Sequence, residues 1–188
     1  MKHERDLHYP KCDIICLGTY LKQTNYKDDH KKIELTQWLS FKHNMGMAFT
    51  RDVWTKIQLC AANFCQFDDY NWDWSLFHVS MTCLKQKLRV MLIKGPRVFH
   101  IGECGVHHIK AQCDTEKVVR KVQTILEKAN PFLYPKNLIV TTLPPKKNAK
   151  LPKGNGGWGD KRDQLMCLNM STFNSTLLHE QLGELVGL

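Results

Sequence analysis

The sequence predicts an α/β fold, because short apolar runs of strand length alternate with segments of helical spacing. Residues 13–17, 88–93 and 138–143 are apolar runs, and glycine or proline follows each of them closely. Residues 116–129 form the clearest amphipathic pattern, with valine, isoleucine and leucine on one face and lysine and arginine opposite. The chain has 188 residues, 43% of them hydrophobic, which is enough to bury a core.

The first fifty residues contain two predicted strands. Residues 1–11 are polar and charged, and residues 13–17 read as a buried strand. Residues 21–32 are densely charged without a period, which predicts a surface loop. Residues 38–50 alternate between apolar and polar, which predicts a strand with a close backbone approach at Gly46.

Helices and strands are predicted to follow. Residues 51–64 have apolar side chains at helical spacing. A helix that starts near residue 69 and runs to residue 83 would carry Asp73 on its first turn. The short apolar runs at 88–93 and 97–101, separated by a Gly-Pro pair, both fit strands.

The stretch from residue 67 to residue 75 carries the strongest chemical signal. It sets carboxylates and one amide among large aromatic rings: Asp68, Asp69, Tyr70, Asn71, Trp72, Asp73 and Trp74. Aromatic rings offer flat apolar platforms with polar edges, which suit the face of a sugar. Asp73, between two indoles, is the best candidate for a general base that takes a proton from a bound hydroxyl. The alternative is an acidic helix start whose tryptophans belong to the core.

The charge balance favours an anionic partner. The formal net charge is +9, from 27 basic and 18 acidic side chains, which suits a phosphate-bearing ligand, a nucleic acid or a lipid surface. No segment approaches the roughly 20 apolar residues of a membrane-spanning helix, and the first residues contain no apolar run of signal-peptide length. We therefore expect no membrane anchor within this sequence.

Eight cysteines point to an oxidising compartment. No Cys-x-x-Cys pair occurs, and the spacings resemble a disulfide framework more than a zinc ribbon. Cys104, His107, His108 and Cys113 can be read as a zinc site, although a disulfide between the two cysteines is preferable. Two glycosylation sequons, at Asn169 and Asn174, fit the same compartment.

Three further positions are candidate ligand sites. His100 ends a predicted strand before a glycine-punctuated loop, where α/β proteins commonly display ligand-binding residues; the alternative is an ordinary surface or core histidine. Asn44 either presents an amide to a ligand or serves as a turn residue before a glycine. The glycine-rich stretch 155–160 can let backbone amides approach an anion.

Several motifs together resemble one enzyme family. They are Cys-Asp-Ile-Ile with Leu17-Gly-Thr-Tyr20, His43-Asn-Met-Gly46, Asp68-Asp-Tyr-Asn-Trp-Asp-Trp74, Pro96-Arg-Val-Phe-His100, Cys104-Gly-Val-His-His108, and Asn155-Gly-Gly-Trp-Gly-Asp160 with Arg162-Asp163. In this order and spacing the chain resembles the Golgi alpha-1,6-mannosyl-glycoprotein 2-beta-N-acetylglucosaminyltransferases. The resemblance runs from about Cys12 to Cys167 and covers only the C-terminal part of that family.

The resemblance implies a fold and a domain division. The fold would be the C-terminal portion of a GT-A type glycosyltransferase domain, an α/β structure whose mixed sheet is flanked by helices and held by disulfides. Residues 1–11 would be a polar N-terminal segment, residues 12–168 the acceptor-side part of the domain, and residues 169–188 a tail.

The resemblance also implies a reaction and residue roles. N-acetylglucosamine would move from UDP-N-acetylglucosamine to the 2-hydroxyl of the alpha-1,6-linked mannose of N-glycans, with inversion and with Mn²⁺ bound to the diphosphate. Asp73 matches the catalytic base and His100 the metal ligand. The acceptor-binding positions match Asn44, Tyr70, Asn71 and Trp72. One positioned carboxylate suffices for inversion, since it takes the acceptor proton as the hydroxyl attacks opposite the leaving diphosphate.

Disulfide pairs follow from the same resemblance. The implied pairs are Cys60 with Cys83, Cys65 with Cys167, and Cys104 with Cys113. The family partner of Cys12 would fall at Tyr9, and a bridge from Cys12 to Cys16 is left as an open alternative.

The implied partners are an N-glycan acceptor on glycoproteins and a nucleotide sugar, not a nucleic acid polymer. The implied location is the lumenal face of the Golgi membrane. This sequence lacks the family's membrane anchor, its stem and its nucleotide-binding half with the acidic metal motif. We therefore expect weak metal and UDP binding and little or no transfer by this chain alone. A non-catalytic carbohydrate-binding protein is the alternative.

Overall fold

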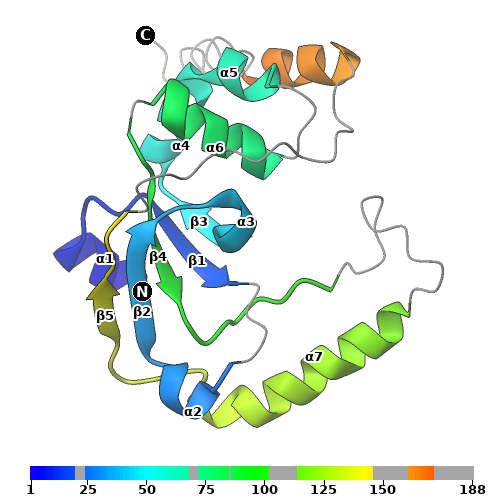
Figure 1. Cartoon of the computed structure of the whole chain (residues 1–188). Coiled ribbons are helices and arrows are strands. Elements are labelled where there is room, and N and C mark those ends of the chain that lie inside the picture. Colours follow the sequence, from blue (N-terminus) through cyan, green and yellow to red (C-terminus); the bar gives the residue numbers. More distant parts are fainter. Residues whose placement is uncertain (20–23, 68–71, 85, 102–113, 146–160, 172–188) are drawn as a thin grey trace, which may run out of the picture. The chain divides into compact units, whose positions relative to one another are not determined.

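The computed structural model describes residues 1–19, 24–67, 72–84, 86–101, 114–145 and 161–171 (Figure 1). The chain divides into two compact units. The first unit comprises Met1–Thr50 and Leu88–Ala149, and the second comprises Arg51–Lys87 and Lys150–Leu188. Each unit is therefore built from two segments that are distant in the sequence.

The first unit contains a mixed β-sheet, as predicted. Among the described residues its strands are β1 (Ile14–Gly18), β2 (Lys32–Gln37), β3 (Met45–Phe49), β4 (Arg89–Ile93) and β5 (Ile139–Thr142). The spatial order is β3-β1-β4-β2-β5. The pairs β1 with β4 and β2 with β5 are parallel, whereas β1 with β3 and β2 with β4 are antiparallel. The predicted α/β fold with a mixed sheet and disulfides is confirmed.

Strand β4 forms the centre of the core because it lies between two neighbours. Its residues 90–93 are all buried, which explains their unbroken apolar sequence. On β2, Ile33 and Leu35 are buried whereas Lys32 and Glu34 are partly exposed, as on a strand with one covered face. Ile33 and Leu35 pack with Met91 and Cys12, and this apolar cluster anchors the sheet.

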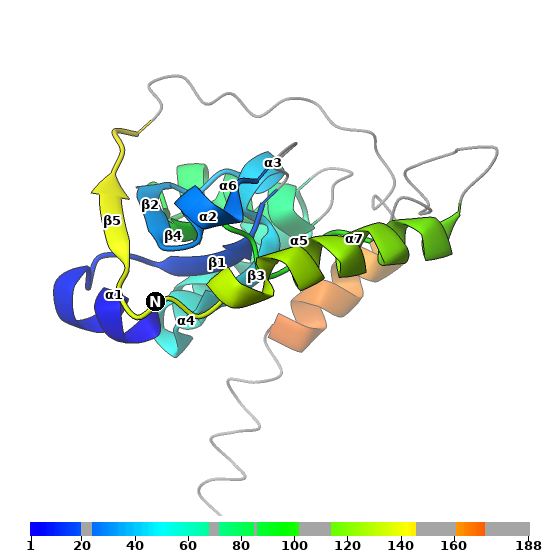
Figure 2. The same ribbon diagram turned by 90° about the horizontal axis from the view of Figure 1, so that it is seen from below.

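Short helices and one long helix complete the first unit. They are α1 (Lys2–His8), α2 (Tyr26–Asp29), α3 (Ser40–His43), α7 (Thr115–Ala129) and the 3-10 helix η1 (Asn130–Phe132). Figure 2 shows the length of α7. It begins at Asp114, whose side chain accepts a hydrogen bond of 2.9 Å from the backbone amide of Lys117. This cap and the amphipathic pattern explain why α7 agrees with the sequence prediction.

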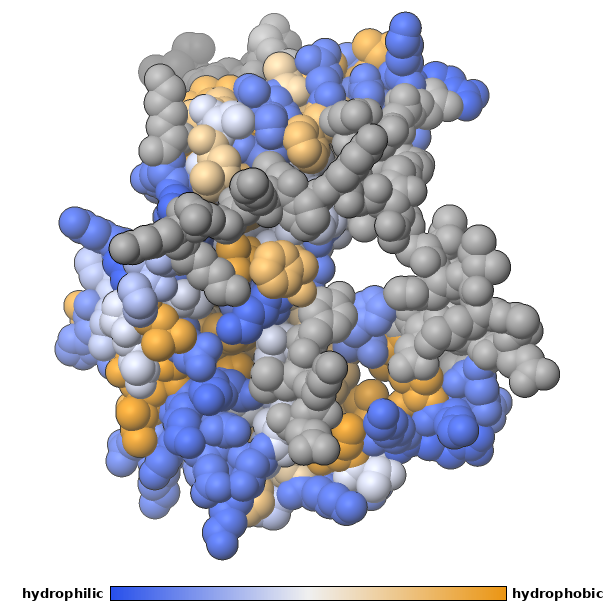
Figure 3. All heavy atoms as spheres, viewed as in Figure 1, coloured by the Kyte–Doolittle hydropathy of each residue, from blue (hydrophilic) through white to orange (hydrophobic). Residues whose placement is uncertain are grey.

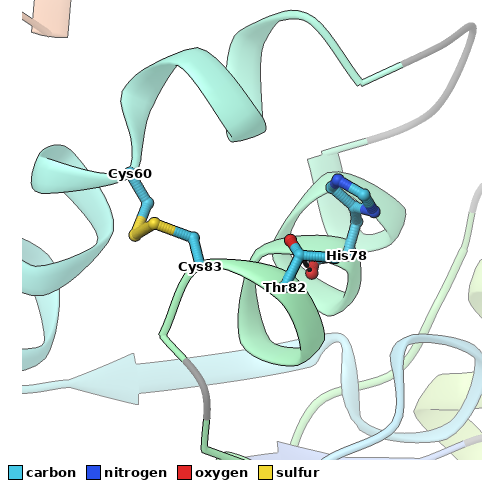
Figure 4. Close-up of a disulfide and its surroundings, with 4 residues drawn as sticks. All are labelled: Cys60, His78, Thr82 and Cys83. Atoms are coloured by element: carbon cyan, nitrogen blue, oxygen red, sulfur yellow. Dashed lines mark hydrogen bonds between the residues drawn. A yellow bond between two sulfur atoms is a disulfide. The ribbon is translucent and has the colours of Figure 1, made fainter.

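The second unit is helical in its described part. It contains α4 (Arg51–Leu59), α5 (Ala61–Cys65), α6 (Trp72–Thr82) and a helix at residues 161–171. The single helix predicted over 51–64 is interrupted at Cys60, which lies between α4 and α5. Cys60 forms a disulfide with Cys83 (Figure 4). The junction between α4 and α5 is therefore covalently bonded to the residue that follows α6.

Two predictions for the N-terminal region are corrected by the structure. The described part of the predicted loop 21–32 contains α2, because the ring of Tyr26 is buried and its hydroxyl donates to the carbonyl of Pro96 at 2.8 Å. The predicted strand 38–50 is part helix and part strand. Its first half folds as α3, where the backbone amide of Leu39 donates to Nδ1 of His43 at 2.9 Å.

The strand predicted at residues 97–101 is also wrong. Only a single bridge forms in this segment, between Val98 and Gly18. The backbone amides of Arg97 and Val98 both donate to the carbonyl of Leu17, at 2.7 and 3.2 Å. The segment therefore leaves the sheet after one contact with the end of β1.

The close backbone approach predicted at Gly46 is confirmed. Gly46 has a φ of +58°, and a Cβ built there would lie 2.7 Å from Cγ2 of Val98. Both features favour glycine, since a residue with a Cβ is strained in left-handed backbone and its Cβ would displace Val98.

Replacing Gly46 by alanine should therefore destabilise the fold by roughly 2–4 kcal/mol, from the strained backbone and the displaced Val98. Urea unfolding followed by tryptophan fluorescence measures the change. Ala48→Gly is the matched control, because it exchanges the same two residue types at an exposed position of the same strand, β3, where it should cost only about 0.5–1 kcal/mol. Equal losses in the two variants would contradict this explanation.

None of the helices in the described ranges has the length and apolar character needed to cross a bilayer. The predicted division at residues 11/12 and 168/169 stays a prediction.

Candidate functional site

Asp73 lies on the first turn of α6, as predicted. Its side chain is buried, with 6% of the residue exposed, whereas the neighbouring Trp72 is 51% exposed. Trp74 is partly buried. The alternative in which both tryptophans belong to the core is thus wrong for Trp72. The helix start holds a carboxylate inside the unit and presents an indole ring to solvent, and a helix N-terminus favours that negative charge.

Tyr70 and Asn71 lie outside the described residues. The residues that flank 68–71, Phe67 and Trp72, each have a defined place in the second unit. Trp72 begins α6, and the ring of Phe67 stacks on the imidazole of His78, with ring centroids 4.0 Å apart and planes 21° apart. Burial lowers the pKa of His78, which favours the neutral ring in this contact. This stack could not be predicted from the sequence, because its partners are eleven positions apart and the sequence shows only that both are aromatic.

A side-chain hydrogen bond and a disulfide further stabilise the part of α6 that follows His78. The hydroxyl of Thr82 donates to the carbonyl of His78 at 2.8 Å, and Cys83 follows directly with its disulfide to Cys60 (Figure 4). The stack and the disulfide therefore both join the C-terminal part of α6 to the segment around α5.

Two of the three disulfide pairs implied by the resemblance are present. Cys60 is bonded to Cys83, with Cα atoms 6.0 Å apart, and Cys65 is bonded to Cys167, with Cα atoms 5.6 Å apart. The pair Cys104 and Cys113 lies outside the described residues, as do His107 and His108 of the alternative zinc set.

A bridge between Cys12 and Cys16 does not form, because both are buried free thiols. Along an extended chain, cysteines four positions apart are about 13 Å apart, beyond the reach of a disulfide. The Cys16 sulfur instead lies 3.0 Å from the carbonyl oxygen of Gly18 and 3.1 Å from that of Met45. Burial raises the pKa of both thiols, so they remain protonated.

The structure brings the segments that carry Asn44 and His100 together in the first unit. Asn44 directly precedes Met45, which pairs with Gly18 at the carboxyl end of β1. His100 follows Val98, which bridges to the same Gly18. Both candidates therefore lie at the carboxyl end of the parallel pair β1 and β4, where α/β sheets commonly bind ligands.

Arg97 fixes the segment that leads to His100. Its guanidinium donates to the carbonyl oxygens of Leu133 at 2.8 Å and His30 at 3.0 Å, and also to that of Gly95. Burial lowers the pKa of this guanidinium, and satisfied hydrogen bonds compensate for its desolvation. His100 itself is exposed. An anchored segment thus ends in an exposed histidine; the exposure fits a displayed ligand residue, whereas the bonds that anchor Arg97 could not be read from the local pattern.

The described residues do not by themselves form a metal centre. Within the described ranges, no group of three or more histidine, cysteine, aspartate or glutamate side chains could hold an ion. Asp73 and Trp72 belong to the second unit, and Asn44 and His100 belong to the first. The glycine-rich stretch 155–160 lies outside the described residues.

Comparison with known proteins gives consistent results. The family model described as N-acetylglucosaminyltransferase II (MGAT2) matches residues 1–167. Similar curated proteins are named alpha-1,6-mannosyl-glycoprotein 2-beta-N-acetylglucosaminyltransferase. The Sus scrofa protein is 39% identical over 160 residues, which is 84% of this chain and 35% of that protein. The Homo sapiens protein is 35% identical over 158 residues, again 84% of this chain and 35% of the relative.

A plant relative carries the same name. The Arabidopsis thaliana protein is 33% identical over 144 residues, or 69% of this chain and 30% of the relative. The chain spans about a third of the length of the curated relatives that it matches. Because the family model covers residues 1–167, this chain belongs to the N-acetylglucosaminyltransferase II family.

Proposed function

We propose that this chain provides the acceptor side of an inverting glycosyltransferase of N-glycan processing. The donor is UDP-N-acetylglucosamine, and the acceptor is the 2-hydroxyl of an alpha-1,6-linked mannose, which yields a beta-1,2 linkage. The observation that carries the proposal is the family match over residues 1–167, together with relatives named as alpha-1,6-mannosyl-glycoprotein 2-beta-N-acetylglucosaminyltransferases.

In this proposal Asp73 is the general base. Its carboxylate takes the proton of the mannose hydroxyl while the oxygen attacks the anomeric carbon of the donor. The new carbon–oxygen bond forms as the bond to the diphosphate breaks, and UDP leaves with that electron pair from the opposite face. A base on the first turn of a helix is rigidly held, which supports proton transfer from one fixed direction.

The acceptor is proposed to contact aromatic and amide groups. The half-exposed ring of Trp72 offers an apolar platform to one sugar face. Tyr70, Asn71 and Asn44 are proposed to donate and accept hydrogen bonds to sugar hydroxyls. An exposed platform of this kind can bind sugar without catalysis, so Trp72 also favours the second candidate, a non-catalytic carbohydrate-binding protein.

Mn²⁺ is proposed as the cofactor, with His100 as one ligand. Because the described residues hold no complete ligand set, the remaining ligands would be donor oxygens and groups outside the described ranges. Manganese accepts mixed nitrogen and oxygen ligands, and when bound it would offset charge on the departing diphosphate. We propose a lumenal Golgi location, which the disulfides support because such bonds persist in oxidising compartments.

A transfer assay tests the proposal with radiolabelled UDP-N-acetylglucosamine and an N-glycan whose alpha-1,6-linked mannose is unsubstituted. Two proteins are compared: the 188-residue chain, and a chimera in which residues 1–167 replace the matched part of the Sus scrofa relative. We expect the chimera to transfer the sugar, to lose activity with a chelator and to regain it with Mn²⁺. The chain alone should show little transfer, since it spans about a third of the length of these relatives.

Three outcomes distinguish the candidates. Transfer by the chimera supports the glycosyltransferase. Glycan binding without transfer in either protein favours the carbohydrate-binding alternative. A folded chimera that neither binds the glycan nor transfers sugar refutes both, with the unmodified Sus scrofa protein as the positive control.

A further inference from the structure

The helix at residues 161–171 has two distinct faces. Its partly buried residues are spaced by three and four positions, which defines one side of a helix: Gln164, Cys167, Leu168 and Ser171. Cys167 is bonded to Cys65 at the end of α5, so a covalent bond holds this inner face in place. The disulfide therefore keeps the inner face turned toward α5.

Asn169 lies on the opposite face. A step of two positions, from Cys167 to Asn169, turns a side chain by about 200° around the helix axis. Asn169 is accordingly exposed. It is followed by Met170 and Ser171, so an exposed asparagine begins an Asn-x-Ser acceptor sequence.

The outer face also carries three exposed apolar side chains. Leu165 is 59% exposed, Met166 is 65% exposed and Met170 is 64% exposed. Hydrophilic side chains make up much of the surface visible in Figure 3, and neighbouring exposed apolar side chains commonly mark a surface that something covers. Asn169 lies among these three, and a glycan attached there would project over them as a bulky hydrophilic cover.

Glycosylation needs an acceptor sequence, an exposed asparagine and a compartment in which the modification takes place, and the disulfides bear on the compartment. The disulfides Cys60–Cys83 and Cys65–Cys167 form and persist where thiols are oxidised, and secretory compartments that oxidise thiols also glycosylate asparagine. Asn169 lies beyond residues 1–167, the range that the family model matches. A modification there would be a property of this chain that its family membership does not supply.

We propose that Asn169 carries an N-linked glycan. The co-reactant is an oligosaccharide attached to a polyprenyl diphosphate. The carboxamide nitrogen of Asn169 bonds to the first sugar carbon as that carbon's bond to the diphosphate breaks. The polyprenyl diphosphate leaves with the electron pair, and the nitrogen gives one proton to a base of the transferring enzyme. This inference does not depend on the transferase activity proposed above.

The test is expression of the full chain, fused to a cleavable secretory signal, in eukaryotic cells. We expect digestion with an N-glycosidase to increase gel mobility, and peptide mass spectrometry to find Asn169 converted to aspartate. Asn169→Gln and Ser171→Ala should each abolish this conversion. Ser171→Thr is the matched control, because it retains the acceptor sequence and should retain the glycan.

A second acceptor sequence begins at Asn174, so Asn174→Gln is included to separate the two. A glycan that persists in Asn174→Gln and is lost in Asn169→Gln supports the proposal. The proposal is overturned if secreted chain with both disulfides intact carries no glycan on Asn169. It is equally overturned if the glycan is found at Asn174 alone.

Discussion

Replacing Asp73 by asparagine in the chimera should lower kcat by about 10²–10⁴-fold, the usual contribution of a general base. The amide has nearly the same shape as the carboxylate but cannot take the acceptor proton. The KM for the glycan acceptor should therefore change little, since acceptor contacts are retained. Initial rates over a range of acceptor concentrations separate the two constants.

Asp52→Asn is the matched control for this substitution. Asp52 also lies on the first turn of a helix of the second unit, α4, but it is exposed and pairs with Lys56 at 2.8 Å. Both variants remove a negative charge from the start of a helix. Such a charge stabilises a helix only modestly, so its loss should lower the stability of each variant only slightly. Thermal unfolding of each variant shows whether a loss of turnover reflects loss of structure. Near-normal kcat in a folded Asp73→Asn chimera would falsify the assignment of the base.

Removing the Cys65–Cys167 disulfide should have the largest effect on stability. The bond joins residues 102 positions apart, and the chain-entropy model gives about 4–5 kcal/mol for a loop of that length. The double variant Cys65→Ala with Cys167→Ala avoids leaving one reactive thiol. Chemical unfolding in non-reducing buffer measures the change in free energy.

Two further variants test the cause of that loss. Removing the Cys60–Cys83 bond, which spans 23 positions, should cost less, about 3 kcal/mol, because the loop is shorter. Cys12→Ala removes a buried cysteine that is not in a disulfide. If Cys12→Ala destabilises as strongly as the double variants, lost packing rather than lost cross-linking explains the effect.

Local elements were predictable where the sequence pattern is dense and the partner is nearby. Strands β1 and β4 lie in mostly apolar runs, β5 consists of the β-branched residues Ile, Val and Thr, and α7 combines a helical period with its own cap at Asp114. Strand β2 was missed, because its alternation is short and its Lys32 and Glu34 resemble the charged loop before it. Its identity depends on pairing with β4 and β5, which no local window contains.

The segment at 97–101 shows the opposite error. Its apolar residues suit a strand, yet Arg97 bonds to carbonyls 36 and 67 positions away. Those distant acceptors fix the backbone in another path. The order of the strands could not be predicted for the same reason, since β1 pairs with β4 although the segment Arg51–Lys87 of the second unit lies between them in the sequence.

By itself the sequence determined the residue types of the candidate site, the helix that carries Asp73 and the family to which the motifs belong. Only the tertiary structure decided that Asp73 is buried while Trp72 faces solvent, that Phe67 stacks on His78, and that the segments of Asn44 and His100 meet at Gly18. Spacing along a chain specifies which side chains share a local face. Burial and contact depend on neighbours brought in from distant parts of the chain, and those neighbours are chosen only when the whole unit packs.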